Sequence, residues 1–251
     1  MFESTRSLIT RGIRKASNLG VVDKRKGFEL IEVHTLEKIF KKYRVDCVLD
    51  VGANIGQYAN LLRRKVGYQG TLISFEPQPS LFRNLDERAS NDKAWHVEAL
   101  AISSEDGAAQ FNVSYGSEFS SLSKSIDQNQ KRFYGADAIY QTIEVRTETL
   151  ETALRRLKRD LNFERPFLKL DTQGFDHNII MSSVHIMNEF IGFQTELSVL
   201  PIYESSFNYI EAIKIYKDLG FSPCAFFNNN YGHFPHLYEI DGIFLRNDII
   251  S

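Results

Sequence analysis

The sequence predicts an α/β fold in which helices cover both faces of a mostly parallel sheet. Short apolar runs alternate with longer segments whose apolar residues recur at helical spacing, which is the pattern of repeated βαβ units. The first such run is followed directly by a glycine turn, CVLDVGANIGQY (47–58). At 251 residues the chain is long enough for one sizeable hydrophobic core.

Composition is that of an ordinary folded protein. Apolar residues make up 43% of the chain, and 30 Lys and Arg nearly balance 32 Asp and Glu, which gives no general attraction to nucleic acid. Two cysteines, Cys47 and Cys224, are too few for a disulfide framework or a four-cysteine metal site. A reducing cytoplasmic location is therefore expected.

The first 44 residues are predicted to form a helical leader. Between Arg6 and Lys26 there are seven basic residues and one acid, Asp23, and they interrupt any stretch that resembles a signal peptide or a membrane span. Residues 5–18 have the spacing of a short amphipathic basic helix, which either packs on the main body or contacts an anionic membrane or a partner.

The regular elements follow in order along the chain. The first half is expected to contain a helix ending near Tyr43, a strand at 47–51, a helix through Val66, a strand at 71–77, a helix from Ser80 and a strand at 94–103. Residues 104–147 interrupt this alternation, and their alternating and serine-rich segments predict an insertion of antiparallel strands or a lid.

The alternation then resumes. The second half is expected to contain a helix over 150–161, a strand at 166–171, a helix beginning near Asp176, a strand at 190–197, a helix closed by Gly220, and two edge strands at 221–227 and 238–246 that pair antiparallel.

The glycine turn has the spacing Asp50-x-Gly52-x-x-x-Gly56. In a dinucleotide turn, G-x-G-x-x-G, the middle glycine lets the backbone approach a pyrophosphate, but here that position is Asn54. Because its side chain would crowd a diphosphate, the turn favours an adenosine ligand without phosphates, of which S-adenosylmethionine is the common example.

An acid at the end of the second strand supports this interpretation. Neighbouring parallel strands lie about 4.8 Å apart, so Glu76 can reach a ribose lying across the turn. A carboxylate accepts hydrogen bonds from both ribose hydroxyls. The alternative for these features is a tight helix entry next to a solvated charge.

As a set, the motifs resemble those of the FkbM-type methyltransferases, a branch of the S-adenosylmethionine-dependent enzymes with a Rossmann-like class I fold. The resemblance covers residues 45–246. The motifs that carry it are LDVGANIGQY (49–58), SFEPQP (74–79), ALAIS (99–103), VRTETLE (145–151), FLKLDTQGFD (167–176), TELS (195–198), IYESSF (202–207) and EIDGIFLR (239–246).

The resemblance implies a methyltransferase domain over residues 45–251. It implies a seven-stranded sheet of order 3-2-1-4-5-7-6, with the last strand antiparallel to its neighbours, and methyl transfer usually to oxygen. In that order Cys47 and Cys224 lie roughly four strand spacings apart, about 19 Å, too far for a disulfide, so both are expected to be free thiols in the core.

The resemblance also implies roles for individual residues. The expected cofactor-binding residues are Asp50, Gly52, Asn54 and Gly56 in the turn, Tyr58 near the amino-acid end, Glu76 at the ribose, and Ala101 and Ile102 at the adenine.

Three residues are candidates for the reacting end. Asp171 ends the fourth strand and is expected to face the methionine portion of the cofactor, as a base or as a ligand of its amino group. Glu196 ends the fifth strand and is the second candidate for a base, with a buried structural Glu as the alternative. His177 is expected either at the site or on a helical surface. Gln173 stands where family members often have Glu.

The loop NNNYGHFPHLY (228–238) has aromatic and polar side chains that can line a sugar pocket. His233 and His236 are three residues apart, but a proline stands between them and no third ligand is near, so no metal site is predicted.

The sequence therefore predicts an S-adenosylmethionine-dependent O-methyltransferase acting on a sugar, a glycan or another small natural-product hydroxyl, and not on nucleic acid. Two alternatives are an NAD-type oxidoreductase or epimerase on a similar sheet, and a binding module that keeps the cofactor fold without turnover.

Overall fold

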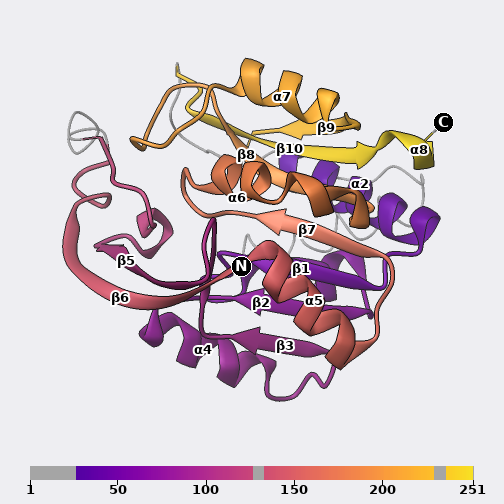
Figure 1. Ribbon diagram of the computed structural model, residues 1–251, viewed down its shortest axis with the longest axis horizontal. Coiled ribbons are helices and arrows are strands. Elements are labelled where there is room, and N and C mark those ends of the chain that lie inside the picture. Colours follow the sequence, from indigo (N-terminus) through magenta and orange to yellow (C-terminus); the bar gives the residue numbers. More distant parts are fainter. Residues whose placement is uncertain (1–26, 127–132, 229–235, 251) are drawn as a thin grey trace, which may run out of the picture.

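A seven-stranded sheet forms the centre of the computed structural model, which describes residues 27–126, 133–228 and 236–250 (Figure 1). Its strands are β1 (Cys47–Val51), β2 (Thr71–Phe75), β3 (Trp95–Glu98), β7 (Pro166–Leu170), β8 (Gly192–Ser198), β9 (Phe221–Phe227) and β10 (Glu239–Arg246). They lie in the order β3-β2-β1-β7-β8-β10-β9, and only β10 runs antiparallel to its neighbours. This confirms the predicted order 3-2-1-4-5-7-6.

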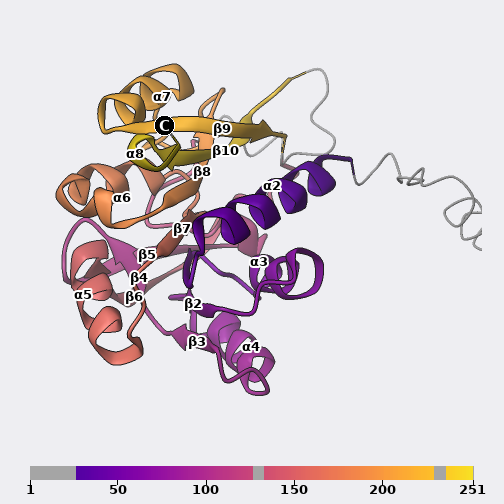
Figure 2. The ribbon, with the colours of Figure 1, turned by 90° about the vertical axis from the view of Figure 1, so that its right-hand side faces the viewer.

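Helices cover both faces of this sheet (Figure 2). One face carries α2 (Gly27–Tyr43), α3 (Gln57–Leu61) and α4 (Pro79–Ala89), and the other carries α5 (Leu150–Leu161), α6 (Asp176–Ser182) and α7 (Tyr209–Asp218). Short helices complete the set: a π-helical turn at Leu62–Val66, 3₁₀ turns at Ser117–Phe119 and Val184–Glu189, and α8 (Asn247–Ile250). The helix predicted through Val66 thus changes to π geometry in its second half.

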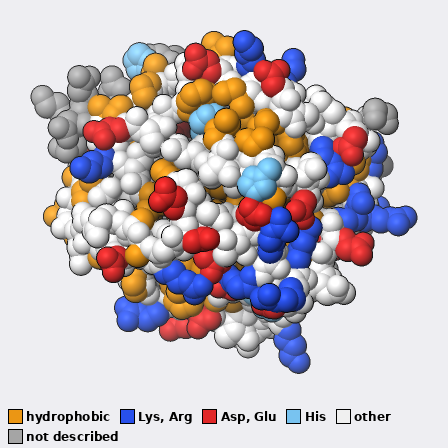
Figure 3. Space-filling view, viewed as in Figure 1, with side chains coloured by type: hydrophobic (Ala, Val, Ile, Leu, Met, Phe, Trp, Pro, Cys, Tyr) orange, Lys and Arg blue, Asp and Glu red, His pale blue; other side chains and the backbone are white. Residues whose placement is uncertain are grey.

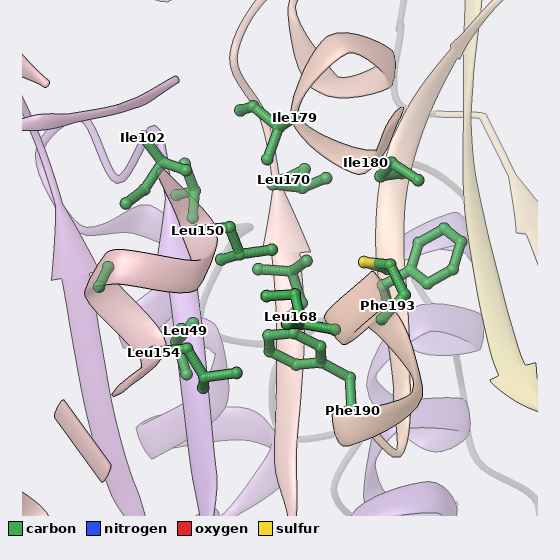
Figure 4. Close-up of a cluster of buried hydrophobic side chains, with 14 of the residues drawn as sticks. Leu49, Ile102, Leu150, Leu154, Leu168, Leu170, Ile179, Ile180, Phe190 and Phe193 are labelled. Carbon is green, nitrogen blue, oxygen red and sulfur yellow. The ribbon is translucent and has the colours of Figure 1, made fainter. Parts of the chain in front are cut away.

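The core is divided by the sheet because successive strand residues point to opposite faces. Figure 4 shows Leu168 and Leu170 of β7 packed with Leu150 of α5 and Ile179 of α6. Phe167, one residue earlier, is fully buried on the opposite face among side chains of α2. Burying a side chain of this size contributes about 1.5–3 kcal/mol, so the two layers account for much of the driving force for folding.

The predicted insertion is a second, three-stranded sheet of order β4-β6-β5, formed by β4 (Ala101–Ser103), β5 (Gly107–Ser114) and β6 (Ile139–Thr149). The prediction of one strand over 94–103 was wrong. Strand β3 leaves the main sheet after Glu98 pairs with Phe75, and β4 then pairs with β6, so the segment serves two sheets.

The prediction for the two cysteines was half right. Both are free, and Cys47 is buried in β1, but Cys224 is exposed. It lies in β9, an edge strand that pairs only with β10. The same edge position tolerates Pro223, which cannot donate a hydrogen bond to a second neighbour.

Part of the N-terminal prediction lies outside the described residues, namely the basic helix over 5–18. From Gly27 onward the predicted stripe of α2 is present, with Leu36, Ile39, Phe40 and Tyr43 buried against the sheet. His233 and its neighbours in the last loop also lie outside the described residues. In the part of the chain that is described, no helix combines the length and apolar character needed to cross a membrane. On the face in Figure 3, acidic and basic side chains are interspersed.

Candidate functional site

The glycine turn lies at the carboxyl end of β1 and is fixed by hydrogen bonds to β2. The N–H groups of Gly52 and Ala53 both donate to the carbonyl of Phe75, at 3.1 and 3.0 Å. Gly52 and Asn54 have positive φ, +81° and +49°. A Cβ added at Gly52 would overlap with the carbonyl oxygen of Asp171. Only glycine therefore allows this turn to lie against the end of β7.

Glu76 closes the turn from the next strand. One carboxylate oxygen accepts a hydrogen bond from the N–H of Asn54 at 2.9 Å, and the other accepts from the N–H of Gln78 at 2.8 Å. Burial raises the pKa of Glu76 to about 7, although both N–H donors act to lower it. Because each carboxylate oxygen has two lone pairs, acceptor capacity remains for a ligand.

Asp50 is held in place by side chains of strand β2 and of its neighbour β3. The hydroxyl of Ser74 donates to Asp50 at 3.1 Å, and the indole N–H of Trp95 donates to Ser74 at 3.0 Å. Burial raises the pKa of Asp50 to about 7, while Lys169 and Ser74 counteract this increase. Asp50 is thus a carboxyl that a hydrogen bond holds in place but that has little access to water.

A cavity of about 320 Å³ opens above these residues, at the carboxyl ends of the parallel strands. Of the residues predicted to bind the cofactor or to form the reacting end, all but Gly56 and His177 line it: Asp50, Gly52, Asn54, Tyr58, Glu76, Ala101, Ile102, Asp171 and Glu196. Gly56 instead lies beneath the turn, where an added Cβ would meet Leu85 and Trp95 at 2.9–3.0 Å. The volume is in the range of small-molecule sites.

The charge of this lining is one-sided. Among the described residues that line the cavity, six are carboxylic acids and none is Lys, Arg or His; the acids are Asp50, Glu76, Glu118, Asp171, Glu196 and Glu239. In addition, the side-chain oxygen of Asn54 is buried without a hydrogen-bond partner among the described residues. The cavity therefore suits a ligand that brings positive charge and hydrogen-bond donors, and it disfavours phosphate.

The serine-rich loop contributes to the cavity wall. Ser117, Ser120 and Leu122 line it, and the side-chain amide of Asn54 donates to the hydroxyl of Ser117 at 3.2 Å. The hydroxyl of Ser121 lies 2.9 and 2.8 Å from the carbonyls of Thr172 and Gln173. This loop therefore connects the glycine turn to the turn after β7.

Asp171 and Glu196 are brought together by hydrogen bonds at the ends of β7 and β8. The carboxylate of Asp176 accepts from the N–H of Thr172 at 2.7 Å and from the N–H of Glu196 at 3.1 Å, which ties the two strand ends to the start of α6. The side-chain amide of Gln173 donates to Asp171 at 2.7 Å and to Glu196 at 3.1 Å. Burial, followed by the charge of Asp171, raises the pKa of Glu196 well above its usual value.

His177 does not reach the cavity. Its ring stacks on Phe207 with centroids 3.8 Å apart, and Nδ1 lies 3.4 Å from the hydroxyl of Tyr216. Burial lowers the pKa of His177. It borders a separate small cavity that Glu196 also lines, and its catalytic role stays a prediction. Within the described residues no group of three His, Cys, Asp or Glu is arranged to hold a metal ion.

Lys169 is the residue that sequence reasoning missed. It is 4% exposed, and its ammonium donates to Asp171 at 3.2 Å and lies 4.0 Å from Asp241. Burial alone would lower the pKa of Lys169, but Asp171, Asp241 and Glu196 raise it well above its usual value. Its signal in the sequence was a lone charge inside the buried strand PFLKL.

A buried polar layer continues beyond Lys169 under α2 and α3. The hydroxyl of Tyr58 donates to Gln194 at 3.2 Å, and the amide of Gln194 donates to Glu32 at 2.9 Å. A second cavity of about 860 Å³ lies over this layer and shares Gln57, Tyr58 and Asp171 with the first. Tyr58 and Asp171 thus line both cavities.

Comparison with known proteins matches residues 50–223 to the methyltransferase FkbM domain family. The chain is similar to several solved structures, among them methyltransferase FkbM from Methylobacillus flagellatus KT (12% identity, TM-score 0.48, 80% of this chain and 43% of that chain), the human methyltransferase 10 domain containing protein (10%, 0.45, 98% and 96%), and Aeropyrum pernix fibrillarin with natively bound S-adenosyl-L-methionine (12%, 0.44, 86% and 74%). No curated protein matches the chain.

The family match covers more than half of the chain and includes the glycine turn, Glu76, and both strand ends at Asp171 and Glu196. It confirms the resemblance predicted from the motifs, and the predicted topology agrees with the sheet order. The chain belongs to the FkbM methyltransferase family, whose cofactor is S-adenosylmethionine.

Proposed function

We propose that the protein transfers a methyl group from S-adenosylmethionine to a hydroxyl oxygen of a small molecule or glycan, leaving S-adenosylhomocysteine. The observation that carries this proposal is the lining of the first cavity, with six carboxylic acids and no basic side chain among its described residues. A sulfonium and an ammonium group are favoured there, whereas the diphosphate of a nicotinamide dinucleotide is repelled.

The residues of the cavity fit the parts of this cofactor. Glu76 retains acceptor capacity for the ribose hydroxyls, Ala101 and Ile102 offer apolar surface to the adenine, and the orphaned oxygen of Asn54 can accept a hydrogen bond. When bound, the cofactor supplies an activated methyl group. Asp171 and Tyr58 line both cavities and would orient its amino-acid end.

Oxygen as the acceptor atom is supported by Glu196. A hydroxyl is a poor nucleophile until it loses its proton, and a carboxyl whose pKa burial raises well above its usual value is, once ionised, a stronger base than an ordinary carboxylate. Glu239 also lines the cavity and acts electrostatically on Glu196, so the reacting end of the acceptor is expected to be uncharged or cationic. A sugar or a phenol meets that requirement.

Two measurements test this proposal. Calorimetry is expected to show S-adenosylmethionine binding at micromolar concentration and no binding of NADH. An assay for S-adenosylhomocysteine release across sugars, nucleotide sugars and phenols is expected to identify the acceptor class. Binding of NADH without binding of S-adenosylmethionine would reject the proposal and favour the oxidoreductase alternative, and cofactor binding without any release would favour the non-catalytic one.

Cofactor binding is predicted to weaken as the pH falls through about 7. Burial raises the pKa values of Glu76 and Asp50 to about 7, so the folded protein takes up protons there that a cationic ligand must displace. Between pH 8 and pH 6 the ionised fraction of each such group falls about tenfold, and we expect the Kd to rise by about tenfold for each of the two groups. Equal Kd values at the two pH values would contradict this, and Glu76→Gln should reduce the difference.

Asp171→Asn is predicted to impair turnover more than binding. The substitution leaves the size of the side chain unchanged but removes the charge that faces Lys169 and the amide of Gln173. We expect kcat to fall about 100-fold, the lower range for loss of a proton-transfer or orienting group, while the Kd for S-adenosylmethionine changes by less than about fivefold. Similar losses in both quantities would show that Asp171 serves mainly to bind the cofactor.

A further inference from the structure

Gln173 forms a bridge between the two carboxylates at the reacting end. Its side-chain nitrogen donates to one oxygen of Asp171 at 2.7 Å and to one oxygen of Glu196 at 3.1 Å. Its side-chain oxygen accepts from the hydroxyl of Tyr203 at 2.8 Å. The amide of Gln173 therefore uses both its donors and its acceptor within the site.

The chemistry of the partners fixes the orientation of this amide. Ionised carboxylates only accept hydrogen bonds, so they require the NH₂ group, and the hydroxyl of Tyr203 then donates to the remaining oxygen. A flipped amide would place its oxygen against two carboxylate oxygens and its NH₂ against a hydroxyl. Tyr203 is 1% exposed, which keeps its ring in place.

The backbone at Gln173 is held in an unfavourable conformation. Its φ is +55°, in the left-handed region that non-glycine residues rarely adopt. The carbonyl of Gln173 lies 2.8 Å from the hydroxyl of Ser121, and the carbonyl of the next residue accepts from the hydroxyl of Ser205 at 2.7 Å. Strain that surrounding contacts maintain in this way is typical of functional sites.

Glu196 needs such a bridge because its surroundings are acidic. The charged and titratable groups that face it are Lys169 from β7, Asp171 directly after β7, Glu239 and Asp241 from β10, Asp176 from α6, and Tyr203 from the loop after β8. Lys169 is the one cation in that set. An amide that donates to both carboxylates lowers the repulsion between them without adding another charge.

We propose that Gln173 is a positioning residue that holds Glu196 beside Asp171 and keeps Glu196 ionised. The hydrogen bond from Tyr203 fixes the amide of Gln173. Ionised Glu196 then takes the proton from the hydroxyl group of the acceptor. This assignment rests on the proposed function. The proton that the acceptor oxygen loses on methylation passes to the carboxylate of Glu196 and from there to water. Gln173 itself gains and loses no proton, and as a neutral amide it adds no further negative charge beside Asp171 and Glu196.

The titration of Glu196 tests the role of the Gln173 amide without any methyl-acceptor substrate. In protein labelled with ¹³C at Glu side chains, the Glu196 signal is identified by its loss in Glu196→Gln. We expect Gln173→Ala to raise the midpoint of that signal by about one pH unit, since a hydrogen bond to the charged form is lost. Tyr203→Phe, which retains the ring, should raise it by less. An unchanged midpoint in folded Gln173→Ala would overturn the proposal.

Turnover gives the second measurement, with the acceptor identified by the release assay. Gln173→Glu adds a third carboxylate, so the acidic limb of kcat against pH should move up by at least about one unit, with the Kd for S-adenosylmethionine within about threefold of wild type. The matched control, Gln110→Glu on the exposed side of β5, makes the same chemical change at a side chain that does not line the cavity, and it should alter neither quantity.

These two measurements separate the inference from the function on which it rests. A shifted Glu196 midpoint with an unshifted kcat limb would show that Glu196 is not the base, and would overturn the proposal. A shifted midpoint with no turnover on any acceptor would support the bridge and count against the proposed methyl transfer instead.

Discussion

Gly52→Ala is expected to destabilise the folded protein by about 3 kcal/mol or more and to weaken cofactor binding at least about tenfold. Two costs combine at this position. A left-handed φ costs an alanine about 1–2 kcal/mol, and the new methyl group would overlap with the carbonyl oxygen of Asp171 while lying 2.8 Å from its carbonyl carbon. Backbone atoms cannot rotate away, so the glycine turn and the end of β7 must separate.

Gly67→Ala is the matched control. Gly67 has nearly the same φ, +75°, but an added Cβ would have no atom within 4 Å. We therefore expect only the conformational cost of about 1–2 kcal/mol in urea unfolding, with cofactor binding unchanged. If both variants lose the same stability, the close approach between the glycine turn and Asp171 is not a constraint on this site.

That close approach illustrates what the sequence could and could not predict. The order of helices and strands was predictable because each has its own apolar period, and the sheet order followed from the motifs of a family. The glycine turn was recognisable from Gly52 and Gly56. The contact between Gly52 and Asp171, which are more than a hundred residues apart, depends on how two strand ends are placed, and no local pattern encodes that distance.

Errors in the sequence analysis have the same origin. The segment 94–103 reads as one apolar strand, and only the pairing partners of β3 and β4 divide it between two sheets. Cys224 was expected in the core although its strand was predicted at the edge of the sheet, where β9 pairs with β10 alone and leaves this side chain exposed. Its exposure is a property of the assembled sheet, which the spacing of apolar residues does not report.

The sequence predicted the glycine turn and the individual acids of the candidate site, but not the hydrogen bonds and ion pairs that connect them. Gln173 was read as the loss of an acid, whereas the structure shows an amide that donates to two acids. Lys169 was passed over as part of a strand. Both residues matter through buried electrostatics, and a sequence gives the types of charged groups but not their mutual distances.

Glu76→Ala is expected to raise the Kd for S-adenosylmethionine about 100-fold. The substitution removes the acceptor for the N–H of Asn54 and for that of Gln78, and it removes the capacity to accept from ribose hydroxyls. Hydrogen bonds to a charged group are worth about 1.5–3 kcal/mol, and about 2.7 kcal/mol corresponds to the expected factor. Calorimetry with S-adenosylmethionine and S-adenosylhomocysteine measures it directly.

Two further variants distinguish the effect of the Glu76 carboxylate oxygens from the effect of negative charge in this region. Glu76→Gln retains the shape but offers one acceptor oxygen, and its NH₂ must face a backbone N–H, so an increase in Kd of at least about tenfold is expected. Glu98→Gln changes the same residue type at the end of the neighbouring strand β3, where the side chain pairs with Arg156 and does not line the cavity. A Kd that rises equally in Glu98→Gln and Glu76→Ala would mean that general negative charge at this edge of the sheet, and not two specific acceptor oxygens, attracts the cofactor.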